Sequence, residues 1–146
     1  IKMRFALLFC AFLFGLSACS IKLKPTAKEV VVEMPDINGF WQLLYINGTK
    51  VTKEQSGKEI PTLAFKTADN SLTGTTGCNR ITGKIRVTPY LVDFENLAAT
   101  RMFCDNAKFE TPLLQLLRGS LSYTLANEEL IFTKEGKQVL VFRRAL

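Results

Sequence analysis

The sequence predicts a mainly β fold of the α+β class, in which an antiparallel sheet curls into a small, partly open barrel with one helix near residues 106–118. Two observations predict this architecture. Seven or eight short segments of alternating apolar residues follow one another along the chain, separated by turn residues. The apolar period then changes once, late in the chain, to that of an amphipathic helix. Such a helix would cover an open side of the curled sheet.

The first predicted strand, at residues 39–47, is apolar on both of its alternating sets of side chains. One set comprises Trp41, Leu43 and Tyr45, and the other comprises Phe40, Leu44 and Ile46. We therefore expect a strand that is covered on both faces. Asn47-Gly48 is a turn signal, and alternation predicts the next two strands at residues 62–66 and 71–75.

The clearest alternation lies at residues 79–87. One face carries Ile81, Gly83, Ile85 and Val87, and the other carries Arg80, Thr82, Lys84 and Arg86. This pattern is typical of an antiparallel strand with one solvated face. Pro89 ends the strand, and another is predicted to begin at residues 90–94.

After Cys104 the apolar residues follow the period of a helix, whose buried face would consist of Phe109, Leu113, Leu116 and Leu117. Asn106 can cap its start and Gly119 its end. Thr111-Pro112 offers the start of a shorter helix instead. Three further strands, at residues 121–126, 130–134 and 139–143, then complete the sheet.

The N-terminal residues 1–18 have the three parts of a secretory signal: a short basic region, an apolar run of 12 residues and small residues at its end. The apolar run is shorter than the roughly 20 residues of a spanning helix. Its end, Leu16-Ser17-Ala18-Cys19, resembles the lipobox of bacterial lipoproteins. We therefore expect Cys19 to be the lipidated N-terminus of the mature chain, although an ordinary leader with a chance cysteine is the alternative.

The expected lipid on Cys19 makes a membrane the first predicted partner. Residues 19–36 are charged and punctuated by proline, which is typical of a tether, and they leave one domain at residues 37–146. Ser20, unlike an aspartate at that position, does not resemble an inner-membrane retention signal. We therefore expect a lipid anchor in the outer membrane and a domain facing the periplasm.

Charge and composition exclude several classes of function. Removal of Lys2 and Arg4 with the leader lowers the formal net charge from +6 to +4, which is modest and predicts no nucleic-acid partner in the periplasm. The sequence contains no histidine, which removes the commonest general base and most catalytic zinc sites. Asp93 and Glu95 are the only carboxylates at a spacing of two in a strand, and solvated charge is the simpler interpretation. We expect no enzymatic activity, no metal and no cofactor.

The four cysteines separate by position. Cys10 leaves with the leader and Cys19 takes the lipid, so Cys78 and Cys104 remain. An even remainder in an oxidising compartment predicts one disulfide, which would close a loop of about 26 residues. Two buried free thiols are the alternative.

Two cysteine-bearing segments stand out. Gly74-Thr75-Thr76-Gly77-Cys78-Asn79-Arg80 lacks the residue order of a phosphate-binding loop and fits a tight glycine turn at a strand end. In Leu97-Ala98-Ala99-Thr100-Arg101-Met102-Phe103-Cys104, the arginine is flanked by apolar residues. It is either a ligand-facing cation or a clamp that holds its loop to the turn at residues 75–79, and we favour the clamp.

Together these segments resemble the paired motifs of the META domain, the HslJ-like heat-shock lipoprotein family, from about residue 37 to the end of the chain. The matching positions, which look structural, are Gly74, Gly77, Asn79, Arg80, Gly83, Thr100, Arg101 and Met102. Ile81 and Phe103 depart from the usual family residues but stay apolar. The resemblance implies a compact antiparallel β fold with a helix, often in envelope lipoproteins, some associated with heat or envelope stress. It supplies no catalytic residues.

Three functions therefore remain open at the level of sequence. The first is a stress-associated envelope module that binds a protein or an apolar, lipid-like ligand, for which the concave face of the sheet is the candidate surface. The second is a periplasmic inhibitor of a secreted hydrolase such as lysozyme, acting through residues 67–71 or 127–129. The third is an enzyme that uses Asp93 and Glu95, which we expect least.

Overall fold

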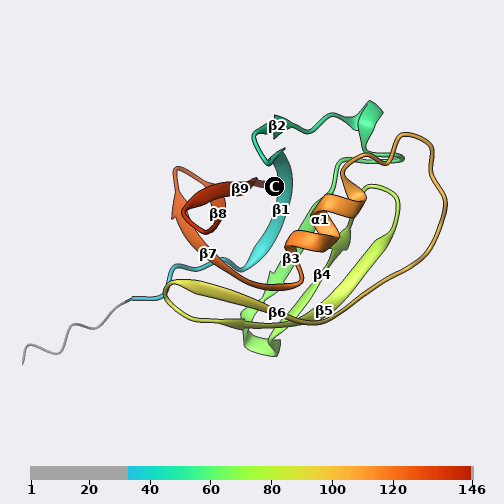
Figure 1. Ribbon diagram of the computed structural model, residues 1–146. Coiled ribbons are helices and arrows are strands. Elements are labelled where there is room, and N and C mark those ends of the chain that lie inside the picture. The colour runs from blue at the N-terminus through green and yellow to red at the C-terminus, as the bar shows by residue number, and fades with distance from the viewer. Residues whose placement is uncertain (1–32, 146) are drawn as a thin grey trace, which may run out of the picture. The chain divides into compact units, whose positions relative to one another are not determined.

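The computed structural model describes residues 33–145 (Figure 1). The predicted leader, the lipidation residue Cys19 and most of the tether lie outside these residues. Residues 33–145 belong to one compact unit. Within the described residues, no helix has the length and apolar character needed to cross a membrane.

One antiparallel sheet contains every strand of the described part, in sequential order from β1 to β9 except that the short β2 flanks β1. Because β1 also pairs with β9, the strands other than β2 close into a barrel, which confirms the predicted fold class. The strands are β1 (Gly39–Ile46), β2 (Thr49–Lys50), β3 (Thr62–Lys66), β4 (Ser71–Thr75), β5 (Arg80–Val87), β6 (Leu91–Ala99), β7 (Gly119–Ala126), β8 (Glu129–Lys134) and β9 (Lys137–Arg144). The helices are α1 (Glu110–Leu116) and the short 3₁₀ turns η1 (Lys53–Gln55) and η2 (Thr67–Asp69).

The inside of the barrel is filled by aromatic side chains. Phe132 lies at its centre, with ring centroids 6.3 Å from Phe65, 5.9 Å from Phe94 and 6.1 Å from Phe142. Trp41 is also fully buried, and its indole N–H donates a 2.8 Å hydrogen bond to the Ile37 carbonyl oxygen. Aromatic rings at these separations favour tilted and edge-to-face packing, so the interior is a packed core.

The prediction that β1 is covered on both faces is wrong. A register shift between Leu43 and Tyr45 in the pairing with β9 inserts one extra residue. This β-bulge places Trp41, Leu43 and Ile46 in the core, while Phe40 and Tyr45 are exposed to solvent. The apolar residues on both alternating sets therefore reflect a change of face within the strand.

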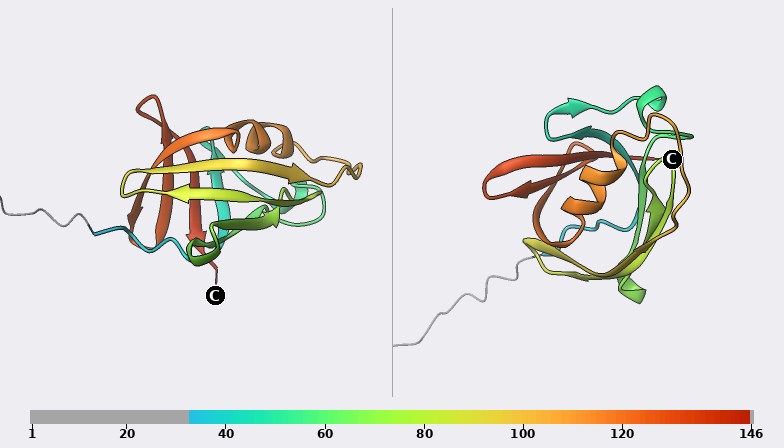
Figure 2. Two further views of the ribbon diagram at one scale, coloured as in Figure 1. Left: turned by 90° about the horizontal axis from the view of Figure 1, so that it is seen from below. Right: turned by 45° about the vertical axis from the view of Figure 1, so that its right-hand side comes forward.

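The helix is shorter than the range 106–118 and begins at neither predicted cap. It spans Glu110–Leu116 with Phe109 at its N-cap, and Asn106 has a positive φ of 57° in the preceding loop. The predicted apolar face is otherwise correct, because Phe109, Leu113 and Leu117 are buried. In Figure 1 and in the right-hand view of Figure 2, α1 lies within the outline of the ring of strands, just before the start of β7.

Strand β6 extends five residues beyond the predicted 90–94 segment, and its two halves differ in pairing. Residues 91–94 pair with β7 on one side, and residues 92–94 pair with β5 on the other. Residues 95–99 continue to pair with β5 alone. Asn96, with a φ of 51°, lies at the irregularity in this pairing and interrupts the alternation that would have revealed the longer strand. The barrel is therefore open between the second half of β6 and β7, as the predicted partly open barrel requires.

Tyr123 makes a pH-dependent contribution to stability. Its hydroxyl donates a 2.9 Å hydrogen bond to the Thr88 carbonyl oxygen, and burial raises the pKa of its phenol. Because the folded pKa lies above the unfolded one, this stability is complete below about pH 10 and is lost as pH rises through the folded pKa. We expect Tyr123→Phe to cost about 1 kcal/mol at pH 7. The Tyr123→Phe variant should also lose less stability than the unaltered chain as the pH rises above about 10.

Urea unfolding at a series of pH values checks this expectation, with Tyr90→Phe as the control because the Tyr90 side chain is exposed. Parallel stability curves for the unaltered chain and Tyr123→Phe above pH 10 would contradict it.

Candidate functional site

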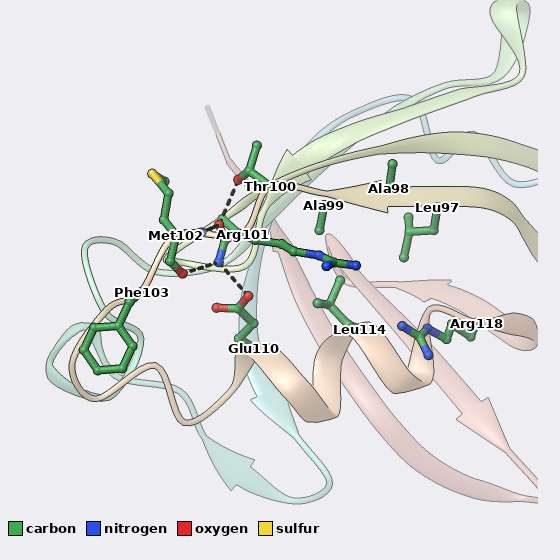
Figure 3. Close-up of a pocket in the computed structure, with 11 residues that line it drawn as sticks. Leu97, Ala98, Ala99, Thr100, Arg101, Met102, Phe103, Glu110, Leu114 and Arg118 are labelled. Carbon is green, nitrogen blue, oxygen red and sulfur yellow. Dashed lines mark hydrogen bonds between the residues drawn. The ribbon is translucent and has the colours of Figure 1, made fainter.

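A groove lies on the surface where the barrel is open, between the second half of β6 and α1 (Figure 3). Residues 97–103 line one side, Glu110, Leu114 and Arg118 line the other, and Asn79 joins them. We call this the α1–β6 groove. Its volume of about 610 Å³ is within the usual range of ligand-binding clefts.

The glycine turn between β4 and β5 forms the support of the groove. A Cβ on Gly74 would collide with the Thr62 carbonyl oxygen, and one on Gly77 would collide with the Ser56 carbonyl oxygen. Gly77 also has a φ of 96°, a backbone conformation that residues with a side chain rarely adopt. These two motif glycines let the turn pack directly against the backbone of residues 56–62. At Gly83, a Cβ would lie 3.1 Å from a methyl group of Leu97, so this glycine lets β5 approach β6 at the irregular pairing.

Asn79 connects the turn to both sides of the groove and is 2% exposed. Its Oδ1 accepts hydrogen bonds from the Met102 N–H (2.6 Å) and the Thr100 hydroxyl (2.8 Å). Its Nδ2 donates to the Met102 carbonyl oxygen (3.0 Å) and to Glu110 Oε1 (2.7 Å). One amide side chain therefore fixes the loop after β6 and the first residue of α1 together (Figure 3).

Arg80 and Met102, two other motif positions, make their contacts beside the groove through backbone atoms. The Arg80 N–H donates to the Thr100 hydroxyl at 3.1 Å, and the Thr100 N–H donates to the Arg80 carbonyl oxygen at 3.0 Å. The side chains of Arg80 and Met102 are exposed. This explains why these positions belong with Asn79 although neither side chain is buried.

Cys78 and Cys104 form a disulfide with a Cα–Cα distance of 5.9 Å, the first of the two predicted alternatives. Gly57 packs against it, since a Cβ there would lie 3.2 Å from the Cys104 Cβ. The adjoining loop is held by an isolated β-bridge between Ser56 and Ala107. The disulfide therefore binds the glycine turn to the loop that leads from the groove into α1.

Arg101 is not the predicted clamp. Its side chain is exposed and runs along β6 toward Leu114 (Figure 3). Across residues 33–145, the structure gives its guanidinium no hydrogen bond and no ion pair. Arg118, on the other side of the groove, is likewise exposed and unpaired within those residues. The clamping role belongs to Asn79, which fits the buried position because it is short and both donates and accepts.

The model of the META domain family matches residues 35–146. The chain belongs to the META domain family. Two solved structures are similar in fold, both determined by NMR. One is 25% identical with a TM-score of 0.58, covering 73% of this chain and 88% of the other. The second, from Burkholderia xenovorans, is 21% identical with a TM-score of 0.57, covering 74% and 82%. No curated protein matches the chain.

The structure thus brings the two META motifs together at one place, with Asn79, Thr100 and the disulfide at their junction. Sequence reasoning missed the second side of the groove, formed by Glu110, Leu114 and Arg118. Leu114 and Arg118 are four residues apart, a spacing that places both on one side of a helix. That spacing is the signal that the sequence carries for this side of the groove.

The remaining predicted site residues lie outside the groove. Asp93 and Glu95 both pair with Arg86, at 4.0 Å and 2.5 Å, and Asp93 also accepts a hydrogen bond from Ser120. The predicted inhibitory segments occupy η2 and the turn between β7 and β8. The part of the chain that the structure describes holds no group of three or more His, Cys, Asp or Glu placed to bind a metal ion.

Proposed function

We propose that this chain is a lipid-anchored envelope protein whose META domain is a non-catalytic module that binds another protein in the α1–β6 groove. The observation that carries the proposal is the pair of guanidiniums, Arg101 and Arg118, beside the apolar side chains of Leu97 and Leu114. Charged groups without a partner next to apolar surface are typical of a binding site that is completed by a ligand. The family association with envelope stress suggests when the module acts.

The packed core favours a protein over an apolar ligand held inside the barrel. Trp41, Phe65, Phe132 and Phe142 are each less than 2% exposed and occupy the interior where such a ligand would sit. A buried ligand would have to displace these side chains, at a cost of several kcal/mol. The groove, by contrast, is open at the surface.

The chemistry of the groove supports binding rather than catalysis. Glu110 is its only carboxylate, and Asn79 donates a hydrogen bond to it. An acid–base mechanism needs a proton-transferring group free to reach a substrate. Glu110 instead has a structural partner, and the chain has no histidine to replace it.

Site-specific photo-crosslinking in the cell envelope tests the groove. Phe103 lines it and is 90% exposed, while Tyr90, 65% exposed in the turn between β5 and β6, provides a matched aromatic control. Benzoylphenylalanine at position 103 should give a discrete adduct that is lost when Arg101→Glu and Arg118→Glu are added. The same group at position 90 should give none. Equal adducts at both positions, or an adduct that survives the charge reversals, would contradict the proposal.

The anchor is tested separately by fractionation. The Cys19→Ser variant should lose incorporation of labelled palmitate and leave the membrane fraction, because each buried lipid methylene contributes about 0.8 kcal/mol to membrane binding. A variant that stays membrane-bound would remove the anchor from the proposal and leave the groove intact.

A further inference from the structure

The side of the α1–β6 groove formed by β6 is a free strand edge. Residues 95–99 pair with β5, but the pairing with β7 stops at Phe94, which lies opposite Gly119. In the region described, no strand covers the other edge of residues 95–99. An unpaired strand edge offers a row of backbone N–H and C=O groups to an incoming chain.

The dimensions suit one added strand. Residues 95–99 of β6 span at most about 17 Å, at about 3.4 Å per residue, and the irregularity at Asn96 lies near one end of this edge. An added strand would lie about 4.8 Å from β6, within the groove that separates this edge from α1. The Leu97 and Leu114 side chains would then contact alternate side chains of the added strand, the usual arrangement in β-strand addition.

The charges of the groove indicate the kind of segment. Arg101 and Arg118 lie along the groove, and neither has an acidic partner in residues 33–145 (Figure 3). The single carboxylate, Glu110, lies at the opposite end of α1 from Arg118 and is held by Asn79. Residues 20–32 of this chain carry three lysines and one glutamate, so they do not complement these arginines. The complementary occupant is acidic.

We propose that the α1–β6 groove binds an extended acidic segment of a partner protein, which adds as a strand to residues 95–99 of β6. Its carboxylates pair with Arg101 and Arg118, and its end nearest Glu110 is uncharged. This inference rests on the proposed binding function of the groove and specifies the partner. An anionic lipid head group shares the carboxylate's charge but has no backbone to pair with the strand edge.

Three synthetic peptides separate backbone pairing from charge. The first alternates threonine and glutamate over eight residues, the second has lysine in place of glutamate, and the third is the acidic peptide N-methylated at alternate residues. Fluorescence anisotropy with the full chain in detergent measures their binding. We expect the acidic peptide to bind, the basic peptide not to bind, and N-methylation on the pairing edge to weaken binding at least about tenfold.

Protein variants place the peptide in the groove. Arg101→Glu with Arg118→Glu should weaken binding of the acidic peptide roughly tenfold or more, because each substitution replaces attraction by repulsion. Arg143→Glu, an exposed reversal on β9, should change it less than about twofold. Thermal unfolding of each variant shows whether it remains folded.

Several results would overturn the inference. One is equal binding of the N-methylated and unmodified acidic peptides, with the methyl groups tested on each of the two peptide edges. Another is binding of phosphatidylglycerol vesicles through Arg101 and Arg118 without binding of the acidic peptide. If the peptide fails while the adduct at position 103 persists, strand addition is wrong and the proposed binding module stands. If both fail, both proposals fall.

Discussion

Removal of the Cys78–Cys104 disulfide is expected to lower the free energy of unfolding by about 3.5 kcal/mol, the chain-entropy value for a loop of this length. The two cysteines are 26 residues apart and join the glycine turn to the loop before α1. The bond also supports the contact of Gly57 with both cysteines. Its loss therefore acts on the unfolded chain and on the loops beside the groove.

Urea unfolding with and without reductant measures this effect. The midpoint should fall by roughly 2 M on reduction. The double variant Cys78→Ser with Cys104→Ser should start from the lower midpoint and show no response to reductant. A midpoint that does not move on complete reduction, verified by thiol counting, would contradict the expectation.

Asn79→Leu is expected to cost about 3 kcal/mol, because it removes four hydrogen bonds that a buried amide makes to Thr100, Met102 and Glu110. The unaltered amide makes four hydrogen bonds to Thr100, Met102 and Glu110 from a position that is 2% exposed. Leucine has a similar size and can make none of them. The loop after β6 and the start of α1 should therefore become less stable together.

Thr100→Val provides the graded comparison. It removes one hydroxyl, which donates to Asn79 and accepts from the Arg80 N–H, and should cost about 1 kcal/mol. Hydrogen exchange of the amides in residues 100–110 should rise in Asn79→Leu and less in Thr100→Val. Equal and small effects of the two substitutions would show that Asn79 does not hold the groove together.

The fold class could be predicted from the sequence because most strands alternate cleanly. Strands β3 and β4 lie where the alternation places them, and β5 begins one residue later than predicted. The hairpin turns also carry local signals, with positive φ at Asn47 and Gly48. In these segments the strand and turn preferences of neighbouring residues are enough to place the elements.

The errors occurred where a single residue changes the register. The β1 bulge moves Ile46 to the same face as Leu43, and Asn96 interrupts the alternation of β6. A bulge depends on the partner strand, so periodicity in one strand cannot reveal it. The sequence therefore predicted that a strand begins at residues 90–94 but not how far it continues, and the free edge beyond the irregularity was missed.

The site was predicted in part for a similar reason. The motif residues were found because they cluster in the sequence, but which of them holds the loop and which is exposed depends on tertiary contacts. Arg101 and Asn79 both have polar and apolar neighbours in the sequence, so either side chain could hold the loop to the glycine turn. Only the folded position of Met102 beside that turn shows that Asn79 does so. The other side of the groove is formed by Glu110, Leu114 and Arg118. The loop between β6 and α1 has no apolar period, so the sequence does not show that these residues return to face β6.

The C-terminal residues hold the segment through which the chain enters the barrel. The Arg144 guanidinium donates to the carbonyl oxygens of Asn38 (2.7 Å) and Asp36 (3.3 Å) and lies 4.4 Å from the centre of the Trp41 ring. The next residue donates from the Ala145 N–H to the Phe40 carbonyl oxygen. Tension applied to the chain ahead of Asp36 is therefore shared between the first and last strands. Because Trp41 lies opposite Arg144, the chain enters and leaves the β1–β9 ladder at the same end. A pull between that segment and the C-terminus would therefore separate the hydrogen bonds of the ladder one after another, which pulling experiments measure as a low rupture force.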